Sequence, residues 1–181
     1  MRQALTLHPG SHCMAATRIE VEIVRPRPGN LVLHYLVTGT IGDLRMPPVT
    51  APARAHELWQ HTCFEAFVRA SPGGAYYEFN FAPSTQWAAY RFGAYRREMS
   101  VASDVNAPRI EAQSHAGSYA LRASLDLDGL SSLPSNAAWR VGLSAVIEET
   151  SGNKSFWALT HPSGKADFHH PDCFACELPA A

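Results

Sequence analysis

The sequence predicts an all-β, antiparallel β-sandwich of two packed sheets, with about nine to ten strands and little helix. Three observations predict this class. Segments with the period-two alternation of half-buried strands recur along the chain, turn residues separate them at frequent intervals, and no long segment has the apolar spacing of a helix. Apolar residues make up 46% of the 181 residues and charged residues 17%, a composition typical of a folded domain.

The N-terminal third supplies the first strands. In residues 17–24, isoleucine and valine alternate with glutamate and arginine, which predicts a strand with one solvated face. Residues 31–39 are apolar on both faces, which favours a central strand. A proline-rich loop follows, because proline cannot donate to a strand ladder. We expect residues 1–17 to be an N-terminal lead-in and residues 18–178 to form a single domain.

Residues 58–92 are the most aromatic stretch of the chain. The sequence holds 4 tryptophans, 6 tyrosines and 8 phenylalanines, and more than half of them lie here. Alternation predicts three successive antiparallel strands, at residues 62–69, 76–81 and 86–92. The Ser-Pro-Gly-Gly segment at 71–74 predicts a hairpin turn between the first two. This stretch is expected to form one wall of a binding site.

Two carboxylates lie inside apolar runs of this stretch. Burying a carboxylate is unfavourable unless it is paired or hydrogen-bonded, so Glu65 and Glu78 need an explanation. Glu78 shares its strand face with Asn80, which would place a polar patch among hydrophobic side chains. One interpretation is a ligand contact by Glu65. The alternative is a structural carboxylate held by Arg91 or Arg140.

The C-terminal half continues the alternation. A loop of about a dozen residues, 161–172, precedes the last strand and is long enough to suggest a functional role. The predicted strands of this half cover residues 109–115, 119–127, 138–149, 155–159 and 173–178.

A resemblance to a known family enters at three motifs, LW-x5-E-x-F, Y-x-EFNF-x-P and DFHHPDCF. With them the chain resembles the DOMON-like proteins related to family 9 carbohydrate-binding modules, over residues 18–178. The resemblance implies a β-sandwich and a non-catalytic module that binds a small molecule, with a glycan or cell-wall-type sugar as the first expectation. The residues that carry it are Trp59, Glu65, Tyr77 to Pro83, Trp139, Arg140, Phe168 and Phe174.

The resemblance also implies which residues would contact a ligand. In the sugar-binding relatives a glycan end lies between two tryptophans, with polar side chains around its rim. Trp59 matches the first tryptophan, and Phe168 stands in place of the second. Asn80 and Ser144 stand where those relatives have an arginine and a glutamine. The expected ligand-binding residues are Trp59, Glu65, Asn80, Ser144, Phe168 and His169, and no catalytic residue is expected.

A haem- or metal-binding module is the alternative. Relatives of another branch bind haem b through a methionine and a histidine, and no such pair stands out here. Three histidines near the C-terminus, His161, His169 and His170, could join His61 and Glu65 around a divalent metal, but their spacing fixes no geometry. Cys173 and Cys176 have the C-x-x-C spacing of a zinc site without a second ligand pair. We therefore expect no bound metal or cofactor.

The second alternative is an enzyme in which His61 and Glu65 act as an acid–base pair. The motifs of nucleophilic catalysis and phosphate binding do not occur in the sequence. The net charge of −1 gives no reason to expect a nucleic-acid partner. No apolar run is long enough to span a bilayer, and polar residues interrupt the N-terminus, so a cytoplasmic protein without a membrane partner is expected.

Overall fold

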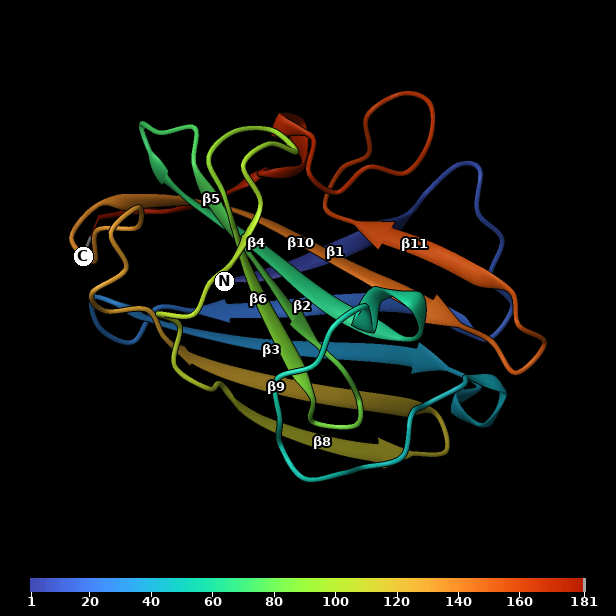
Figure 1. Ribbon diagram of the computed structural model, residues 1–181. Helices are drawn as coiled ribbons and strands as arrows, with labels where there is room; N and C mark the ends of the chain where they lie inside the picture. The colour runs from blue at the N-terminus through green and yellow to red at the C-terminus, as the bar shows by residue number, and fades with distance from the viewer. Residues whose placement is uncertain (181) are drawn as a thin grey trace.

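The computed structural model describes residues 1–180, and within them the chain forms twelve strands and three single-turn 3-10 helices (Figure 1). The all-β, antiparallel class with almost no helix is therefore confirmed. No helix in these residues is long and apolar enough to cross a membrane. The elements are β1 (Arg2–Leu7), β2 (Ala16–Val24), β3 (Asn30–Gly39), η1 (Ile41–Asp43), η2 (Leu58–Gln60), β4 (Cys63–Ser71), β5 (Tyr76–Phe81), β6 (Trp87–Phe92), β7 (Ser100–Val101), β8 (Arg109–His115), β9 (Ser118–Asp126), β10 (Ala138–Glu148), β11 (Lys154–Ala158), η3 (Pro171–Cys173) and β12 (Cys176–Leu178).

The strands form one continuous antiparallel sheet. Its order is β7-β6-β5-β4-β10-β11-β1-β2-β3-β9-β8, with β12 beside β10. Strand β1 provides the continuity, because Arg2–Leu5 pair with β2 while Thr6 and Leu7 pair with β11. The structure thus corrects the predicted pair of separate sheets. Residues 1–17, expected as a lead-in, contain β1, in which burial alternates: Gln3, Leu5 and Leu7 lie on the more buried side, and of these only Leu5 is fully buried.

The sheet curls so that β3 and β9 face β4, and the main core lies between them. Figure 1 shows β4, β5 and β6 crossing over β2, β3 and β9. The Tyr35 hydroxyl on β3 donates a hydrogen bond of 2.6 Å to the Glu65 carbonyl on β4. The rings of Phe64 and Tyr119 stack with centroids 6.0 Å apart. The β4 and β5 side chains in this core are Phe64, Ala66, Val68, Tyr77, Phe79 and Phe81.

The other face of β4 and β5 is covered as well. All six residues of β5 and the first six of β4 are buried, whereas a strand with one solvated face would alternate. A second apolar cluster, formed by Phe67, Tyr76, Phe92 and Phe174, packs on this outer face. Continuous burial therefore marks a part of the sheet that is enclosed from both sides.

Most strands lie where the alternation predicts them. The predicted segments at 76–81 and 109–115 coincide with β5 and β8, and others differ by one or two residues at an end. The last strand is shorter than predicted, because Cys173 belongs to η3 and β12 begins at Cys176. Strand β7 was not predicted, since its two exposed residues have no pattern.

Candidate ligand-binding cavity

A cavity of about 820 Å³ lies on the outer face of the sheet, opposite the main core. Its walls come from η2, from the turn after β6, and from the late loop, which we define as residues 159–170 between β11 and η3. The side chains of three adjacent strands that line it are Glu65 and Phe67 of β4, Glu78 of β5, and Tyr90 and Phe92 of β6. The cavity therefore combines the aromatic stretch with a segment far along the chain.

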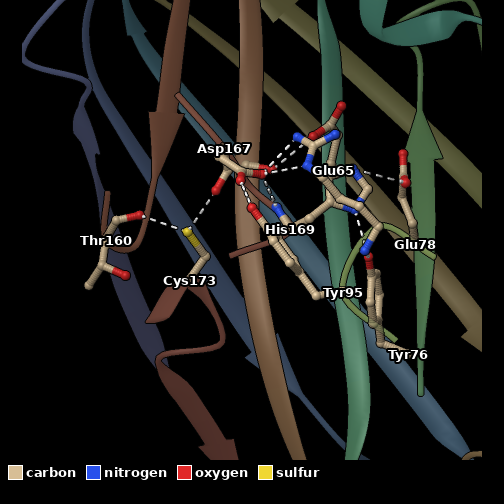
Figure 2. A network of polar contacts seen from close by, with 10 residues as sticks. Glu65, Tyr76, Glu78, Tyr95, Thr160, Asp167, His169 and Cys173 are labelled. Carbon is tan, nitrogen blue, oxygen red and sulfur yellow. Dashed lines mark hydrogen bonds and ion pairs between the residues drawn. The ribbon is translucent and has the colours of Figure 1, made fainter. Parts of the chain in front are cut away.

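The late loop and η3 are held against the sheet by a close backbone contact. Gly142 on β10 pairs with Phe67, and a Cβ at this glycine would lie 3.0 Å from the carbonyl oxygen of Cys173. The missing side chain lets η3 lie directly on the sheet. The Cys173 thiol donates to the carbonyls of Thr160 and Asp167, at 3.3 Å and 3.2 Å, so it contacts both ends of the late loop (Figure 2).

Glu65 is the most deeply buried acid of the cavity, with 3% of its surface exposed. Its Oε2 accepts a hydrogen bond of 2.9 Å from the Ser144 hydroxyl. Its Oε1 has no hydrogen-bond partner among residues 1–180, and the side chain lines the cavity. Burial, followed by the nearby charge of Glu78, raises the pKa of Glu65 to about 8, although the bond from Ser144 opposes the shift. The Glu65 carboxyl group is thus mostly protonated at neutral pH.

Glu78 lies beside a neutral histidine. Burial raises the pKa of Glu78, against the opposing effects of the Asn80 amide and Arg96. Burial, followed by the Arg96 charge, lowers the pKa of His169 to about 4, so its ring is neutral at pH 7. The Nε2 of His169 lies 3.7 Å from Glu78 Oε2, which is too long for a hydrogen bond. No ion pair therefore neutralises Glu78 through this contact.

The tautomer of His169 follows from its other contact. The Tyr76 hydroxyl accepts a hydrogen bond of 3.2 Å from the Arg96 backbone N–H. It lies 2.8 Å from His169 Nδ1, and because it already accepts from Arg96 we assign it as the donor to this nitrogen. This assignment places the imidazole proton on Nε2, the nitrogen nearer Glu78, and Figure 2 shows the ring lying between Tyr76 and Glu78. His169 thus offers a neutral donor next to a carboxylate.

Asp167 ties the late loop to the turn after β6. Its Oδ1 accepts hydrogen bonds from the Arg96 guanidinium at 2.7 Å and 3.1 Å and from the His169 backbone N–H at 3.1 Å. The Tyr95 hydroxyl donates to its Oδ2 (Figure 2). Arg96 holds a left-handed backbone with φ of 52°, which is unfavourable for a residue with a side chain. The Asp167 contacts offset this strain and also engage the Arg96 charge.

Trp59 and Phe168 both line the cavity. Trp59 lies in η2 with 52% of its surface exposed, and its ring belongs to none of the aromatic pairs among residues 1–180. Phe168 is half-buried, and its ring centroid lies 6.2 Å from that of Phe156. The structure thus brings both predicted aromatic contacts to one cavity, with Trp59 as the more accessible of the two.

Asn80 and Ser144 lie behind the carboxylates, and neither is among the lining residues. The Asn80 amide donates a hydrogen bond of 2.8 Å to Glu78 Oε1, and Ser144 binds Glu65. Each pairs directly with Glu65 across a strand ladder, Asn80 from β5 and Ser144 from β10. These two side chains fix the orientation of the carboxyl groups that open to the cavity.

Several expected partners are elsewhere. His61 does not pair with Glu65: its Nδ1 lies 2.7 Å from Glu148 Oε2, and it is not a lining residue. The expected arginine partners of Glu65 are also engaged by others, since Arg91 donates to Ser132 and Arg140 pairs with Glu177.

The residues expected around a metal are also dispersed. His161 contacts the Thr6 carbonyl, and Cys176 contacts Met1, while Cys173 binds carbonyls of the late loop. Within residues 1–180, no three histidine, cysteine, aspartate or glutamate side chains are grouped as metal ligands.

The sequence interpretation omitted several lining residues from the site. Glu78 was predicted to share its strand face with Asn80, and Phe67 lies two residues from Glu65 and so on the same face, so the alternation contained a signal for both. Tyr90 and Phe92 follow from the alternation of β6 once its outer face is known to be covered. Arg96 gave no signal, because it lies in an irregular turn whose contact with Asp167 spans 71 residues.

The fold of the chain is a single curled antiparallel β-sheet that encloses its core. No protein-family model and no curated protein sequence matches it. Two solved structures share the fold at low identity. One is a candidate carbohydrate-binding protein from Bacteroides uniformis, with a TM-score of 0.61 and 16% identity over 95% of this chain and 83% of that one. The other is a family 9 carbohydrate-binding module from Caldicellulosiruptor kristjanssonii in complex with cellotriose, with a TM-score of 0.56 and 12% identity over 91% and 74%.

Proposed function

We propose that the cavity binds a carbohydrate without transforming it. The observation that carries the proposal is a single cavity in which an exposed tryptophan and a half-buried phenylalanine lie with open carboxyl oxygens. Sugar rings have apolar C–H faces that pack on aromatic rings, and their hydroxyl groups donate to carboxyl oxygens.

The roles of the residues follow from their positions. Trp59 and Phe168 supply the stacking surfaces, and Glu65 and His169 make polar contacts. Asn80 and Ser144 act through the carboxyl groups that they orient. The fold likeness to a module in complex with cellotriose supports the carbohydrate class, and it leaves the DOMON-like part of the resemblance as a proposal.

Titration calorimetry with cellotriose and a panel of other oligosaccharides tests the proposal. Trp59→Ala and Phe168→Ala should each weaken binding by roughly 10- to 100-fold, which corresponds to the loss of one buried aromatic contact. Met14→Ala is the control, because Met14 is 73% exposed and lies outside the cavity. The sugar should be recovered unchanged after incubation.

A panel with no binder, or a binder indifferent to Trp59, would overturn the proposal. A Soret band or bound metal in the purified protein would favour the haem or metal alternative. Turnover of the sugar that Glu65→Gln abolishes would favour an enzyme.

A further inference from the structure

Acidic side chains outnumber basic ones in the cavity lining. Three carboxyl groups line it, those of Glu57, Glu65 and Glu78, and its one lining arginine is Arg96. Arg96 already donates two hydrogen bonds to Asp167, which is not a lining residue. The lining histidine beside Glu78 is neutral at pH 7. Among the described residues, the buried carboxyl groups therefore have neutral hydrogen-bond donors and no ion pair with an arginine or lysine, although the Arg96 charge still favours the ionised form of Glu78.

One carboxyl oxygen of Glu65 is open to the cavity. Only 3% of the Glu65 surface is exposed. Its side chain nevertheless lines the cavity, and its Oε1 accepts no hydrogen bond from residues 1–180. This oxygen is accessible from the cavity, since it is not one of the fully buried side-chain atoms that lack a partner, so a ligand can donate a hydrogen bond to it. A positively charged donor would gain most, because hydrogen bonds between charged groups are about twice as strong as neutral ones.

The remaining surface of the cavity suits an organic cation better than a metal ion. Phe67, Tyr90, Phe92 and Trp59 line it, and calcium or magnesium would need six or more oxygen ligands. Aromatic faces attract ammonium groups through cation–π contacts, and carboxylates complete such cages. The apolar walls would also pack against the carbon skeleton next to the amine.

Building on the proposed function, we infer that the preferred ligand is an amino sugar with a free, protonated amine, bound by Glu65 and Glu78 and packed against the aromatic walls. The amine takes the place of the missing cation. Its charge favours the ionised form of the carboxyl pair, so binding at pH 7 releases up to one proton from that pair. A neutral sugar in the same cavity releases none.

Few other groups could supply this proton. The titratable or charged neighbours of Glu65 are Cys63 on its own strand, Tyr35 on β3, Glu78 on β5, and His169 and Arg96 on the loops. Burial raises the pKa of the Cys63 thiol and of the Tyr35 hydroxyl, so both stay protonated, and Arg96 stays charged. His169 is already without its extra proton at pH 7. His56 also lines the cavity, so the loss of proton release in Glu65→Gln is the result that assigns the proton to the carboxyl pair.

Three β-1,4-linked trisaccharides that differ at one position per ring test the inference: cellotriose, fully deacetylated chitotriose and N-acetylated chitotriose. Calorimetry at pH 7 should give at least about tenfold tighter binding of the deacetylated sugar than of the other two, as expected for one charge-assisted contact. The measured enthalpy should depend on the buffer, phosphate or Tris, for that sugar only. In Glu65→Gln the deacetylated sugar should bind about as tightly as the other two, with a ratio of about one. Glu22→Gln, at an exposed position of β2, should leave the ratio unchanged.

The outcomes separate the two proposals. Equal affinity for cellotriose and the deacetylated sugar overturns the amine inference and leaves carbohydrate binding intact. If no trisaccharide binds, carbohydrate binding is overturned, and benzylamine then tests the cation site directly. Benzylamine binding that Glu65→Gln abolishes supports an ammonium site, and failure to bind overturns the inference as well.

Discussion

Ser144 on β10 and Glu65 on β4 face each other directly across a strand ladder, and the serine hydroxyl donates a 2.9 Å hydrogen bond to the carboxyl group. This is the polar partner that the structure gives Glu65 in place of an arginine. A hydroxyl orients the carboxyl group without supplying a positive charge. Glu65 therefore keeps a raised pKa, and the stability of the unliganded protein should depend on pH.

The sign of this dependence follows from the two states. The pKa of Glu65 is about 8 in the folded protein and near 4.5 in the unfolded chain. Between these values the folded state retains a proton that the unfolded state has lost, so stability decreases as pH rises from 4.5 to 8. Glu65→Gln should remove this decrease. The free energy of unfolding of the variant, relative to that of the original protein, should therefore rise by on the order of a few kcal/mol between pH 4.5 and 8.

Urea unfolding at pH 5, 6.5 and 8 measures the free energy of unfolding of both proteins. Glu22→Gln, at an exposed position of β2, is the control and should follow the original protein. Parallel pH profiles for Glu65→Gln and the original protein would contradict the prediction.

Truncation of Trp59 and of Phe67 should have very different effects on the free energy of unfolding, although both residues line the cavity. Trp59→Ala should change the free energy of unfolding by less than about 0.5 kcal/mol, because half of this side chain is exposed. Phe67→Ala should lower it by about 3–5 kcal/mol, since Phe67 is 1% exposed and packs in the second cluster. Chemical unfolding at one pH compares them, and a Trp59→Ala protein as unstable as Phe67→Ala would show that the tryptophan is structural.

Asp167→Asn should loosen the late loop without unfolding the sheet. The change weakens the charge-assisted hydrogen bonds from Arg96, and we expect the free energy of opening the late loop to fall by about 1–2 kcal/mol. Hydrogen exchange should become faster at residues 94–98 and 165–170 while β4 and β10 stay protected. Glu111→Gln removes the exposed pair with Arg109 and serves as a control with little effect. Uniform acceleration in every strand would contradict a local role.

Thiol reactivity should separate Cys13 from the other three cysteines. Burial raises the pKa of Cys63 well above its usual value, that of Cys173 to about 11, and that of Cys176. Since the thiolate is the reactive form, iodoacetamide at pH 8 should label half-exposed Cys13 first. Mass spectrometry maps the sites, with all four labelled in guanidinium as the control. Labelling of Cys173 as fast as Cys13 in the folded protein would contradict the burial described above.

The strands were predictable because their side chains alternate in local sequence. β2, β5 and β9 each have a repeating pattern that a one-dimensional reading detects. β1 was missed because its more buried side combines polar Gln3 with Leu5 and Leu7, and its partners lie on two different strands. The join between the two halves of the sheet therefore could not be predicted from local pattern.

The cavity was predictable in part for the same reason. Trp59, Glu65, Phe168 and His169 were expected at a site, and all four line one cavity. The partner of Glu65 could not be deduced, because strand pairing between β4 and β10 decides that Ser144 faces it. The contact of His169 with Tyr76 joins residues 93 positions apart and also depends on the final packing.

The position of β1 has a consequence for how the molecule is made. Thr6 pairs with Ala158, and its hydroxyl donates to the Ala158 carbonyl across 152 residues of sequence. The N-terminal partner leaves the ribosome long before β11 is made, so Thr6 and Leu7 of β1 have no strand partner during most of synthesis. Such long-range pairings slow folding and expose strand edges to wrong partners. Closure of the sheet by β1 is therefore expected to be a late step, after β11 has emerged.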